Sequence, residues 1–424
     1  MNVADGFTYI DRELHCGSVR VSDVVRETGT PLYLLNLDAV LATYERHRDA
    51  FSAFSHRTCF AVKANSSRAL LQALARAGCG FDVNSRGELY RALTAGANPR
   101  RITMTGVGKS HADIRDGLAA GVAFFNAESA SECRLISALA EEHGVVAEVL
   151  LRLNPDVETD THPYISTGES AHKFGLSPAD IRSLASQASW LPGLRIAGLS
   201  MHLGSQILSP APYGQALRIL LRVLDDITPM LDRPPDTIDI GGGFGVRYDV
   251  THGELPPARV AAVVAEVLGT RDTPWTLITE PGRSLVANAG ALIAAVAHVK
   301  PSAHRNFLIL DAGMNDLLRP ALYQASHSII PVRERDDDVQ LYDIVGPVCE
   351  SSDTFATNYA LPTQDPGDLV ALLSAGAYGS SMSSNYNSRP LAAEAVVYKN
   401  AWSLARARQS LDDLVRGEQP LPEV

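Results

Sequence analysis

The chain has 424 residues, too many for one ordinary hydrophobic core, so two domains are expected. Its apolar fraction of 46% and charged fraction of 20% are those of a globular protein, and its net charge of −11 argues against a nucleic acid partner. No apolar run is long enough to span a bilayer, and no signal-like segment opens the chain. The five cysteines are scattered and contain no C-x-x-C pair, so we expect no disulfide framework, no metal site and a reducing cytoplasm.

Short apolar runs alternate with longer amphipathic stretches from about Leu32 to Glu280. The expected strands are Leu32–Leu35, Thr58–Val62, Phe81–Val83, Ile102–Met104, Phe124–Asn126, Val149–Leu153, Leu199–His202, Ile238–Ile240 and Leu277–Thr279. The expected helices between them are Leu37–Phe54, Arg68–Ala77, Gly87–Ala95, Ala130–Glu142, Pro178–Ala188 and Tyr213–Leu231. About eight such units predict a closed, parallel (β/α)8 barrel of the TIM type rather than an open sheet.

After Arg283 the pattern changes to strand-like runs separated by turn residues. These runs are Ala291–Val299, Asn306–Leu310, Leu341–Val345, Asp368–Leu373 and Ala393–Tyr398, and Val19–Val21 is a short strand candidate that could join them. The chain is therefore predicted to be an α/β protein with a barrel over residues 32–282. Residues 1–31 and 283–424 are expected to form a second, mostly β domain.

Residues that carry chemistry gather where the predicted barrel strands end. They are Lys63, Asp82, Arg152, His202, Gly241–Gly243 and Glu280. In a barrel of this kind the active site is built at the carboxyl ends of the strands. Together these residues supply an amine for a Schiff base, backbone N–H groups for a phosphate and a carboxylate for a pyridine nitrogen. Pyridoxal phosphate (PLP) requires these three features.

Each of these residues also has a plainer interpretation. Lys63 could be a strand-end lysine that reaches solvent, although Asp82 and Arg152 at neighbouring strand ends could orient it and tune its amine. Glycine-rich turns after strands are common, so the triple glycine binds phosphate only if the other parts of a PLP site are present. The carboxylate of Glu280 could pair with a pyridinium, or it could form a structural salt bridge to Arg283.

Further residues have side chains suited to contacts with the cofactor or to proton transfer. His202 could stack on the cofactor ring while Ser205 reaches the phosphate, although a lone histidine is more often a core residue. Cys349 lies beside Glu350 and a turn, which makes it a candidate proton donor rather than inert packing.

Arginines are natural carboxylate clamps because their donors fork. Arg283, Arg319 and Glu350 together would match a substrate end that bears one carboxylate and one ammonium group. Tyr378, between Gly376 and Gly379, has the right chemistry for a substrate clamp.

Nearly the whole chain resembles the fold-type III PLP-dependent decarboxylases of the ornithine, arginine and diaminopimelate group, and most closely the diaminopimelate decarboxylases. The stretches that carry the resemblance are Phe60–Asn65, Thr161–Gly168, Lys173–Gly175, His202–Gln206, Glu280–Arg283, Asp311–Tyr323, Cys349–Asp353, Gly376–Gly379 and Asn385–Pro390. The resemblance implies an alanine racemase-like fold and decarboxylation of meso-2,6-diaminopimelate to L-lysine and CO2, the last step of lysine biosynthesis.

The resemblance also implies roles for individual residues. Lys63 would hold PLP as a Schiff base and Cys349 would be the proton donor. The other cofactor-binding residues would be Asp82, Arg152, His202, Ser205, Gly242, Gly243, Glu280, Gly282, Arg283 and Tyr378. The substrate-binding residues would be Arg283, Arg319, Tyr323, Glu350 and Tyr378. Cys349 and Glu350 would come from the partner subunit, so the active unit would be a homodimer with shared active sites.

Three alternatives stay open. A related decarboxylase could act on carboxynorspermidine, citryl-diaminopropionate or a carrier-bound amino acid, although Arg319, Tyr323 and Glu350 favour diaminopimelate. A catalytically inactive, PLP-binding regulator would not need both Lys63 and Cys349. A racemase on the same barrel would need a tyrosine base in the surroundings of Cys349.

Overall fold

The computed structural model describes residues 2–158, 173–249, 253–269, 275–302 and 305–422. The chain divides into two compact units. Residues 41–247 and 252–285 form one, called here the barrel unit, and residues 1–40, 248–251 and 286–424 form the other, called the β unit. The motif at 161–168 lies outside the described residues.

Eight parallel strands close into a barrel in the barrel unit, which confirms the predicted (β/α)8 fold. The strands are β6 (His56–Ala61), β7 (Gly80–Val83), β8 (Ile102–Met104), β9 (Phe124–Ala127), β10 (Ala147–Leu153), β11 (Leu194–Met201), β12 (Thr237–Asp239) and β13 (Thr276–Thr279). Consecutive strands are neighbours, and β13 closes the ring by pairing with β6. Because all eight run in the same direction, their carboxyl ends meet at one mouth.

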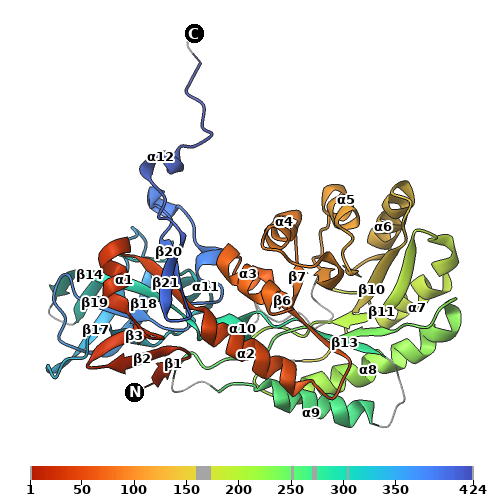
Figure 1. Ribbon diagram of the computed structural model, residues 1–424, viewed down its shortest axis with the longest axis horizontal. Coiled ribbons are helices and arrows are strands. Elements are labelled where there is room, and N and C mark those ends of the chain that lie inside the picture. Colours follow the sequence, from red (N-terminus) through yellow and green to blue (C-terminus); the bar gives the residue numbers. More distant parts are fainter. Residues whose placement is uncertain (1, 159–172, 250–252, 270–274, 303–304, 423–424) are drawn as a thin grey trace. The chain divides into compact units, whose positions relative to one another are not determined.

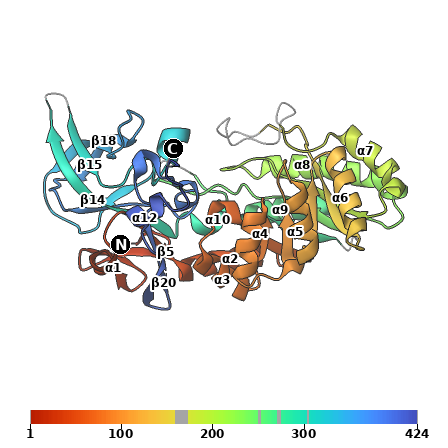
Figure 2. The same ribbon diagram turned by 90° about the horizontal axis from the view of Figure 1, so that it is seen from above.

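Helices surround the ring, as Figures 1 and 2 show: one precedes the first barrel strand, and each of the others follows a strand. They are α2 (Leu37–Ala50), α3 (Arg68–Arg76), α4 (Arg86–Thr94), α5 (His111–Ala120), α6 (Ala130–Glu142), α7 (Pro178–Ser186), α8 (Ala211–Ile227) and α9 (Pro257–Leu268). Four of them begin after a serine whose side chain accepts a hydrogen bond from the N–H three residues later: Ser85, Ser110, Ser129 and Ser177. Such a cap stabilises a helix by about 1 kcal/mol, so these four starting points are encoded locally.

The β unit is built around a nine-stranded sheet whose main path runs β18-β17-β15-β14-β5-β20-β21, with β19 pairing β14 and β16. Its strands are β5 (Leu32–Asn36), β14 (Gly290–Pro301), β15 (Asn306–Leu310), β16 (Ile329–Pro331), β17 (Val339–Val345), β18 (Thr354–Pro362), β19 (Leu369–Leu372), β20 (Ala393–Tyr398) and β21 (Ala401–Arg406). A separate four-stranded sheet comprises β1 (Asn2–Ala4), β2 (Phe7–Ile10), β3 (Glu13–Cys16) and β4 (Val19–Arg20). Its short helices are α1 (Val21–Thr28), α11 (Arg319–Tyr323) and α12 (Leu411–Leu414), whereas α10 (Arg283–Val286) begins in the barrel unit and ends in the β unit.

Strand β5 corrects one expectation. The sequence pattern placed Leu32–Leu35 first in the barrel series, but β5 pairs with β14 and β20 in the nine-stranded sheet. All five of its residues are buried, because Leu32 and Leu34 pack into one core and Tyr33 into another. A strand covered on both faces reads as a continuous apolar run, which is also the signature of a barrel strand.

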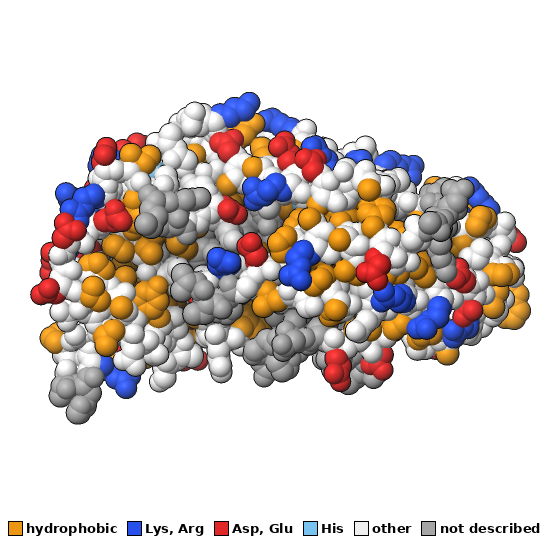
Figure 3. Space-filling view, turned by 90° about the horizontal axis from the view of Figure 1, so that it is seen from below, with side chains coloured by type: hydrophobic (Ala, Val, Ile, Leu, Met, Phe, Trp, Pro, Cys, Tyr) orange, Lys and Arg blue, Asp and Glu red, His pale blue; other side chains and the backbone are white. Residues whose placement is uncertain are grey.

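Among the described residues, no helix is long and apolar enough to cross a membrane, and no group of three or more His, Cys, Asp or Glu side chains is arranged to hold a metal ion. The cysteines are free thiols, four of them buried and Cys349 exposed. On the face drawn in Figure 3, acidic and basic side chains are interspersed, and basic residues form no continuous stripe there.

Two histidines, the buried His47 of α2 and the half-buried His56 of β6, meet at the last residue of β13. The Nε2 atom of each lies 2.9 Å from the hydroxyl oxygen of Thr279. That hydroxyl has one hydrogen, so it can donate to one histidine and must accept from the other. Burial first, and then His56, lower the pKa of His47 to about 3, and burial lowers the pKa of His56 to about 4. Both rings are therefore neutral in the folded protein.

Glycine is required at position 198 in β11, because a Cβ atom there would lie 1.8 Å from the carbonyl oxygen of Thr237 in β12. We expect Gly198→Ala to reduce the free energy of unfolding by at least about 1–3 kcal/mol, since the two strands would have to separate. Urea denaturation of both proteins measures the change. The control is Gly108→Ala, where an added Cβ meets nothing within 4 Å. Equal stability of the two variants would contradict the expected barrel packing.

The histidine pair predicts a loss of stability in acid. In the unfolded chain each histidine has a pKa of about 6.5, so below that pH the unfolded state binds more protons than the folded state. The contribution of the pair is therefore complete above about pH 6.5 and falls toward pH 4, by about 1.4 kcal/mol per pH unit for each histidine. Buried carboxyl groups whose pKa is raised contribute in the opposite direction, so the test compares variants with wild type. The denaturation midpoint of His47→Gln, relative to that of wild type, should rise as the pH falls from 7 to 5, whereas the difference between wild type and a variant with glutamine in place of the exposed His111 should stay constant.

Candidate active site

Lys63 lies at the barrel mouth, in a single turn of 3-10 helix (Val62–Ala64) that directly follows β6. Its Nζ atom is 3.8 Å from the Oδ2 atom of Asp82 in β7. The Asp82 side chain is fully buried, and its oxygens have no hydrogen-bond partner among the described residues. The Lys63 side chain is 40% exposed, so its amine is held at the edge of the buried interior and can still be reached from the mouth.

Three carboxyl groups gather beneath the mouth: Asp82, Asp239 at the end of β12, and Glu280 directly after β13. Burial first, then the charges of Asp239 and Asp82, raise the pKa of Glu280 well above its usual range. Burial likewise raises the pKa of Asp239 to about 6. The amide of Asn126 donates to the Oε1 atom of Glu280 over 3.3 Å. Acidic groups this close together repel one another when ionised, and a cationic partner would stabilise their ionised forms.

The glycine loop after β12 presents bare backbone. Gly241 and Gly243 have positive φ angles of 70° and 96°, which favour glycine, and a Cβ atom on Gly242 would lie 2.1 Å from the carbonyl oxygen of Glu280. The hydroxyl of the buried Tyr213 donates to the carbonyl of Gly242 over 2.7 Å. The loop is thus fixed in a shape that leaves no room for side chains, as a backbone cradle for an anion requires.

His202 follows β11, and its Nδ1 atom accepts a hydrogen bond of 3.3 Å from the backbone N–H of Gly242. Burial, then the charges of Lys63 and Arg152, lower its pKa well below the usual value. The ring is therefore neutral, with its proton on Nε2. Nearby, Arg283 at the start of α10 donates from Nε and Nη2 to the hydroxyl of Ser205, over 3.2 and 2.9 Å.

Arg152 of β10 is bound to a residue that the sequence analysis did not single out. Its Nη1 atom lies 2.7 Å from the Oε1 atom of Glu128, both side chains are buried, and the guanidinium stacks over the ring of Phe174 at 4.9 Å. The second carboxylate oxygen of Glu128 accepts from the N–H of Gly175 over 3.1 Å. Glu128, Asn126 and Asp239 were missed, although each lies at or just after the end of a barrel strand, a signal that could have found them.

The remaining predicted site residues lie in the β unit. Arg319 opens α11, and its Nη1 atom is 2.8 Å from the Nε2 atom of His327, whose Nδ1 atom is 2.7 Å from the carbonyl oxygen of Leu373. A carbonyl only accepts, so His327 carries its proton on Nδ1 and accepts from Arg319 at Nε2. The guanidinium also lies 4.2 Å from the centre of the Tyr248 ring. Arg319 is therefore held from two sides.

Four other residues of the β unit complete the predicted set. Tyr323 closes α11. Tyr378 has a φ angle of 55°, an uncommon backbone conformation for a side chain of this size, which is often found at functional sites. Cys349 and Glu350 are exposed in the loop between β17 and β18. The thiol is thus accessible, unlike those of the other four cysteines.

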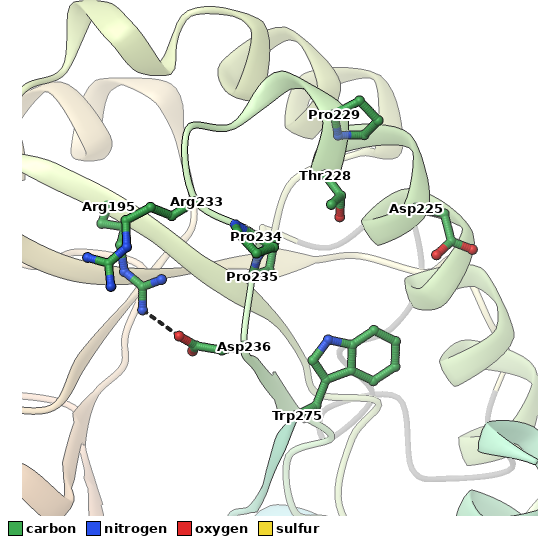
Figure 4. A pocket seen from close by; sticks show the side chains of 9 residues that line it. All are labelled: Arg195, Asp225, Thr228, Pro229, Arg233, Pro234, Pro235, Asp236 and Trp275. Atoms are coloured by element: carbon green, nitrogen blue, oxygen red, sulfur yellow. Dashed lines mark hydrogen bonds and ion pairs between the residues drawn. The ribbon is translucent and has the colours of Figure 1, made fainter. Parts of the chain in front are cut away.

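A different pocket of about 590 Å³ lies near the amino-terminal ends of β11, β12 and β13 (Figure 4). Its lining includes Trp275 and the pair Arg195–Asp236, whose charged atoms are 2.8 Å apart. Arg195 also pairs with Glu148 over 2.6 Å. None of the predicted site residues lines this pocket. Residues at this end of a barrel usually contribute to stability rather than to catalysis.

Comparisons with known proteins agree with the geometry. Residues 37–287 match the family model described as pyridoxal-dependent decarboxylase, pyridoxal binding domain. The chain is 43% identical to a diaminopimelate decarboxylase of Pseudomonas aeruginosa, over 99% of this chain and 100% of that protein. Diaminopimelate decarboxylase from Helicobacter pylori, solved with L-lysine, superposes with a TM-score of 0.89 at 37% identity, covering 93% of this chain and 98% of the other.

The corresponding enzyme from M. jannaschii, also solved with L-lysine, superposes with a TM-score of 0.94 at 32% identity, covering 99% of both chains. The resemblance inferred from the sequence motifs is confirmed, and the similarity extends through both units rather than the barrel alone. The chain therefore belongs to the pyridoxal-dependent decarboxylases and, among them, to the diaminopimelate decarboxylase family.

Proposed function

We propose that this chain decarboxylates meso-2,6-diaminopimelate to L-lysine and CO2, the last step of lysine biosynthesis, with PLP as its cofactor. The observation that carries the proposal is the full-length similarity to relatives named diaminopimelate decarboxylase, two of them solved with L-lysine. The chain is thus a PLP-dependent carboxy-lyase. Its cysteines are free thiols, as a reducing compartment such as the cytoplasm would keep them.

The residues of the barrel mouth fit PLP. A protonated pyridine nitrogen is a cation that suits Glu280, whose pKa is raised by burial and by its acidic neighbours Asp239 and Asp82. The glycine loop presents bare backbone and is packed so closely that a Cβ atom at Gly242 would lie 2.1 Å from the carbonyl oxygen of Glu280. Gly282 packs against the Lys63 turn, since a Cβ atom there would lie 3.0 Å from that of Ala64. These features support PLP binding at the mouth.

Each site residue has a proposed role in binding the cofactor. Lys63 would hold its aldehyde carbon, the neutral ring of His202 would lie against the cofactor ring, and Glu280 would keep the pyridine nitrogen protonated. The phosphate would be held by backbone and hydroxyl groups together with one arginine: Gly242, Gly243, Ser205, Gly282, Arg283 and Tyr378. Asp82 orients the Lys63 amine, and Arg152, neutralised by Glu128, supports the wall of the site.

When bound, PLP supplies an electron sink for the electron pair that the departing carboxylate leaves on the α carbon. The chain's own residues position the substrate and return a proton. Arg319, prearranged by His327 and Tyr248, binds the distal carboxylate together with Arg283 and Tyr323. Glu350 receives the distal ammonium. The thiol of Cys349 delivers its proton to the α carbon and is then reprotonated from solvent.

We propose that the active unit is a homodimer in which Cys349 and Glu350 of one copy complete the barrel mouth of the other. Two facts support this arrangement. Lys63 and the glycine loop belong to the barrel unit, whereas Cys349 and Glu350 belong to the β unit. The thiol and the carboxylate are also exposed on their own chain, as groups that serve another chain must be.

Substrate choice provides the direct test. Purified enzyme with PLP is offered meso-diaminopimelate, ornithine, arginine and lysine in parallel, and CO2 release is measured. We expect turnover of diaminopimelate far above that of the other three. Lys63→Ala should lose both turnover and the absorbance of covalently held cofactor while remaining folded, because it lacks the required amine. Lys300→Ala, an exposed lysine of β14, should behave as wild type. Preference for another substrate would refute the proposed reaction, and activity in Lys63→Ala would refute the role of Lys63.

The shared active site predicts that two inactive variants rescue each other. Mixing Lys63→Ala with Cys349→Ala under conditions that exchange subunits makes about half of the dimers mixed. Each mixed dimer has one site that carries both lesions and one that carries neither, so activity should recover to about a quarter of wild type.

The matched control mixes Lys63→Ala with His202→Ala. Both lesions are then in barrels, every site keeps one, and nothing should be restored. If the first mixture also stays inactive while exchange is confirmed by mass spectrometry, Cys349 acts within its own chain.

A further inference from the structure

The segment Asn385–Arg389 carries no role in the reaction proposed above, yet its backbone is unusual. Asn387 and the following Ser388 both have φ angles of 55°, in the left-handed region. Two consecutive non-glycine residues in that region are energetically unfavourable, and such strain persists only where surrounding contacts enforce it. The contacts of this segment therefore indicate what it does.

Two neighbouring residues of the segment hold two neighbouring residues of the proposed site. The hydroxyl of Tyr386 donates to the Oε2 atom of Glu350 over 2.7 Å. The side-chain oxygen of Asn387 accepts from the backbone N–H of Cys349 over 3.1 Å. The first contact orients the carboxylate of Glu350, and the second fixes the backbone of Cys349, which carries the thiol.

The segment is itself anchored. The amide of Asn385 donates to the carbonyl of Arg389 over 2.8 Å and to the side-chain oxygen of Gln409 over 2.7 Å. Arg389 donates to the carbonyl of Asp311 over 2.6 Å. These bonds tie Tyr386 and Asn387 to two other parts of the β unit, so the segment can serve as a fixed support.

The loop that carries Cys349 and Glu350 is held separately at its base. The buried carboxylate of Asp353 accepts from the backbone N–H groups of Met314 and Val348, over 2.6 and 2.7 Å. The side chain of Glu350 does not bond to Asp353 but accepts from Tyr386 and, at 3.0 Å, from the hydroxyl of Ser352. Asp353 can therefore fix the loop without fixing the orientation of the carboxylate.

The protonation states of Glu350 and Tyr386 favour the hydrogen bond between them. Tyr386, then Ser352, lower the pKa of Glu350, and Glu350 raises the pKa of Tyr386. At neutral pH the carboxylate is ionised and the phenol keeps its proton. A hydroxyl donating to an ionised carboxylate is a charge-assisted hydrogen bond, and each carboxylate oxygen keeps a further lone pair for a cation beside the bonds from Tyr386 and Ser352.

We propose that Tyr386 and Asn387 are positioning residues for the reaction: Tyr386 orients the Glu350 carboxylate toward the distal ammonium of the substrate, and Asn387 fixes the backbone of Cys349 for proton delivery. This inference rests on the roles proposed above for Glu350 and Cys349. It assigns a function to the Asn385–Arg389 segment in recognising substrates whose distal end carries an ammonium group.

Tyr386→Phe tests the first half. We expect the KM for meso-diaminopimelate to rise roughly 5- to 20-fold with kcat changed less than threefold, because the lost hydrogen bond orients a binding group. Cofactor absorbance and denaturation temperature should match those of wild type. Tyr398→Phe, which alters an exposed tyrosine at the end of β20, should leave both constants unchanged. In Glu350→Gln, the KM should rise, and adding Tyr386→Phe should cause little further change.

Asn387 is tested with two variants that both tolerate a positive φ. Asn387→Gly removes the acceptor oxygen and should lower kcat roughly 10-fold with KM nearly unchanged, whereas Asn387→Asp keeps an acceptor and should restore most of kcat. Both should fold and bind PLP as wild type does.

The outcomes separate this inference from the function on which it rests. If Glu350→Gln raises KM but Tyr386→Phe does not, the positioning role of Tyr386 is wrong and the proposed clamp stands. Equal kcat in Asn387→Gly and wild type would likewise overturn the role of Asn387. Unchanged kcat/KM in Glu350→Gln would overturn both the clamp and its support by Tyr386.

Discussion

The close burial of three carboxyl groups is the constraint on which the rest of the barrel mouth depends. Asp82, Asp239 and Glu280 lie at or just after the ends of three strands, where the barrel forces them together. Like charges in a buried site cannot all be ionised without cations nearby, and the raised pKa values of Glu280 and Asp239 express that conflict. Lys63 relieves it only in part, at 3.8 Å from Asp82. A positively charged group bound at the mouth would relieve it further.

Much of the barrel could be predicted from the sequence. Eight predicted strands correspond to β6 through β13, because buried parallel strands are continuous apolar runs and the intervening helices have their own periodicity and serine caps. Strand β5 was misplaced for the same reason, since it too is buried on both faces. Whether a buried run joins the barrel or the nine-stranded sheet depends on its pairing partners, and those lie hundreds of residues away.

The candidate site was predictable where a residue type is chemically conspicuous at a strand end, as with Lys63 or Glu280. Glu128, Asn126 and Tyr386 were not, because each acts on another side chain rather than on a ligand. Their partners are distant in sequence, so spacing gives no sign of these contacts, although Glu128 and Asn126 share the strand-end position of the conspicuous residues. Residues that orient other residues therefore emerge only from three-dimensional contacts, even in a chain whose motifs identify the chemistry.

The connectivity of the β unit has a consequence for the order in which the chain can fold during synthesis. Strand β5 needs β14 and β20 as neighbours, and the backbone N–H of Lys399 bonds to Asp38, 361 residues earlier. By contrast, the barrel unit is complete once residue 285 has left the ribosome. Domains generally fold as they emerge, so a finished barrel would be tethered to an apolar β5 strand still without its neighbours. Unpaired apolar strands favour aggregation. Strand β5 is synthesised early, but it stays unpaired until β14 and β20 have also been synthesised.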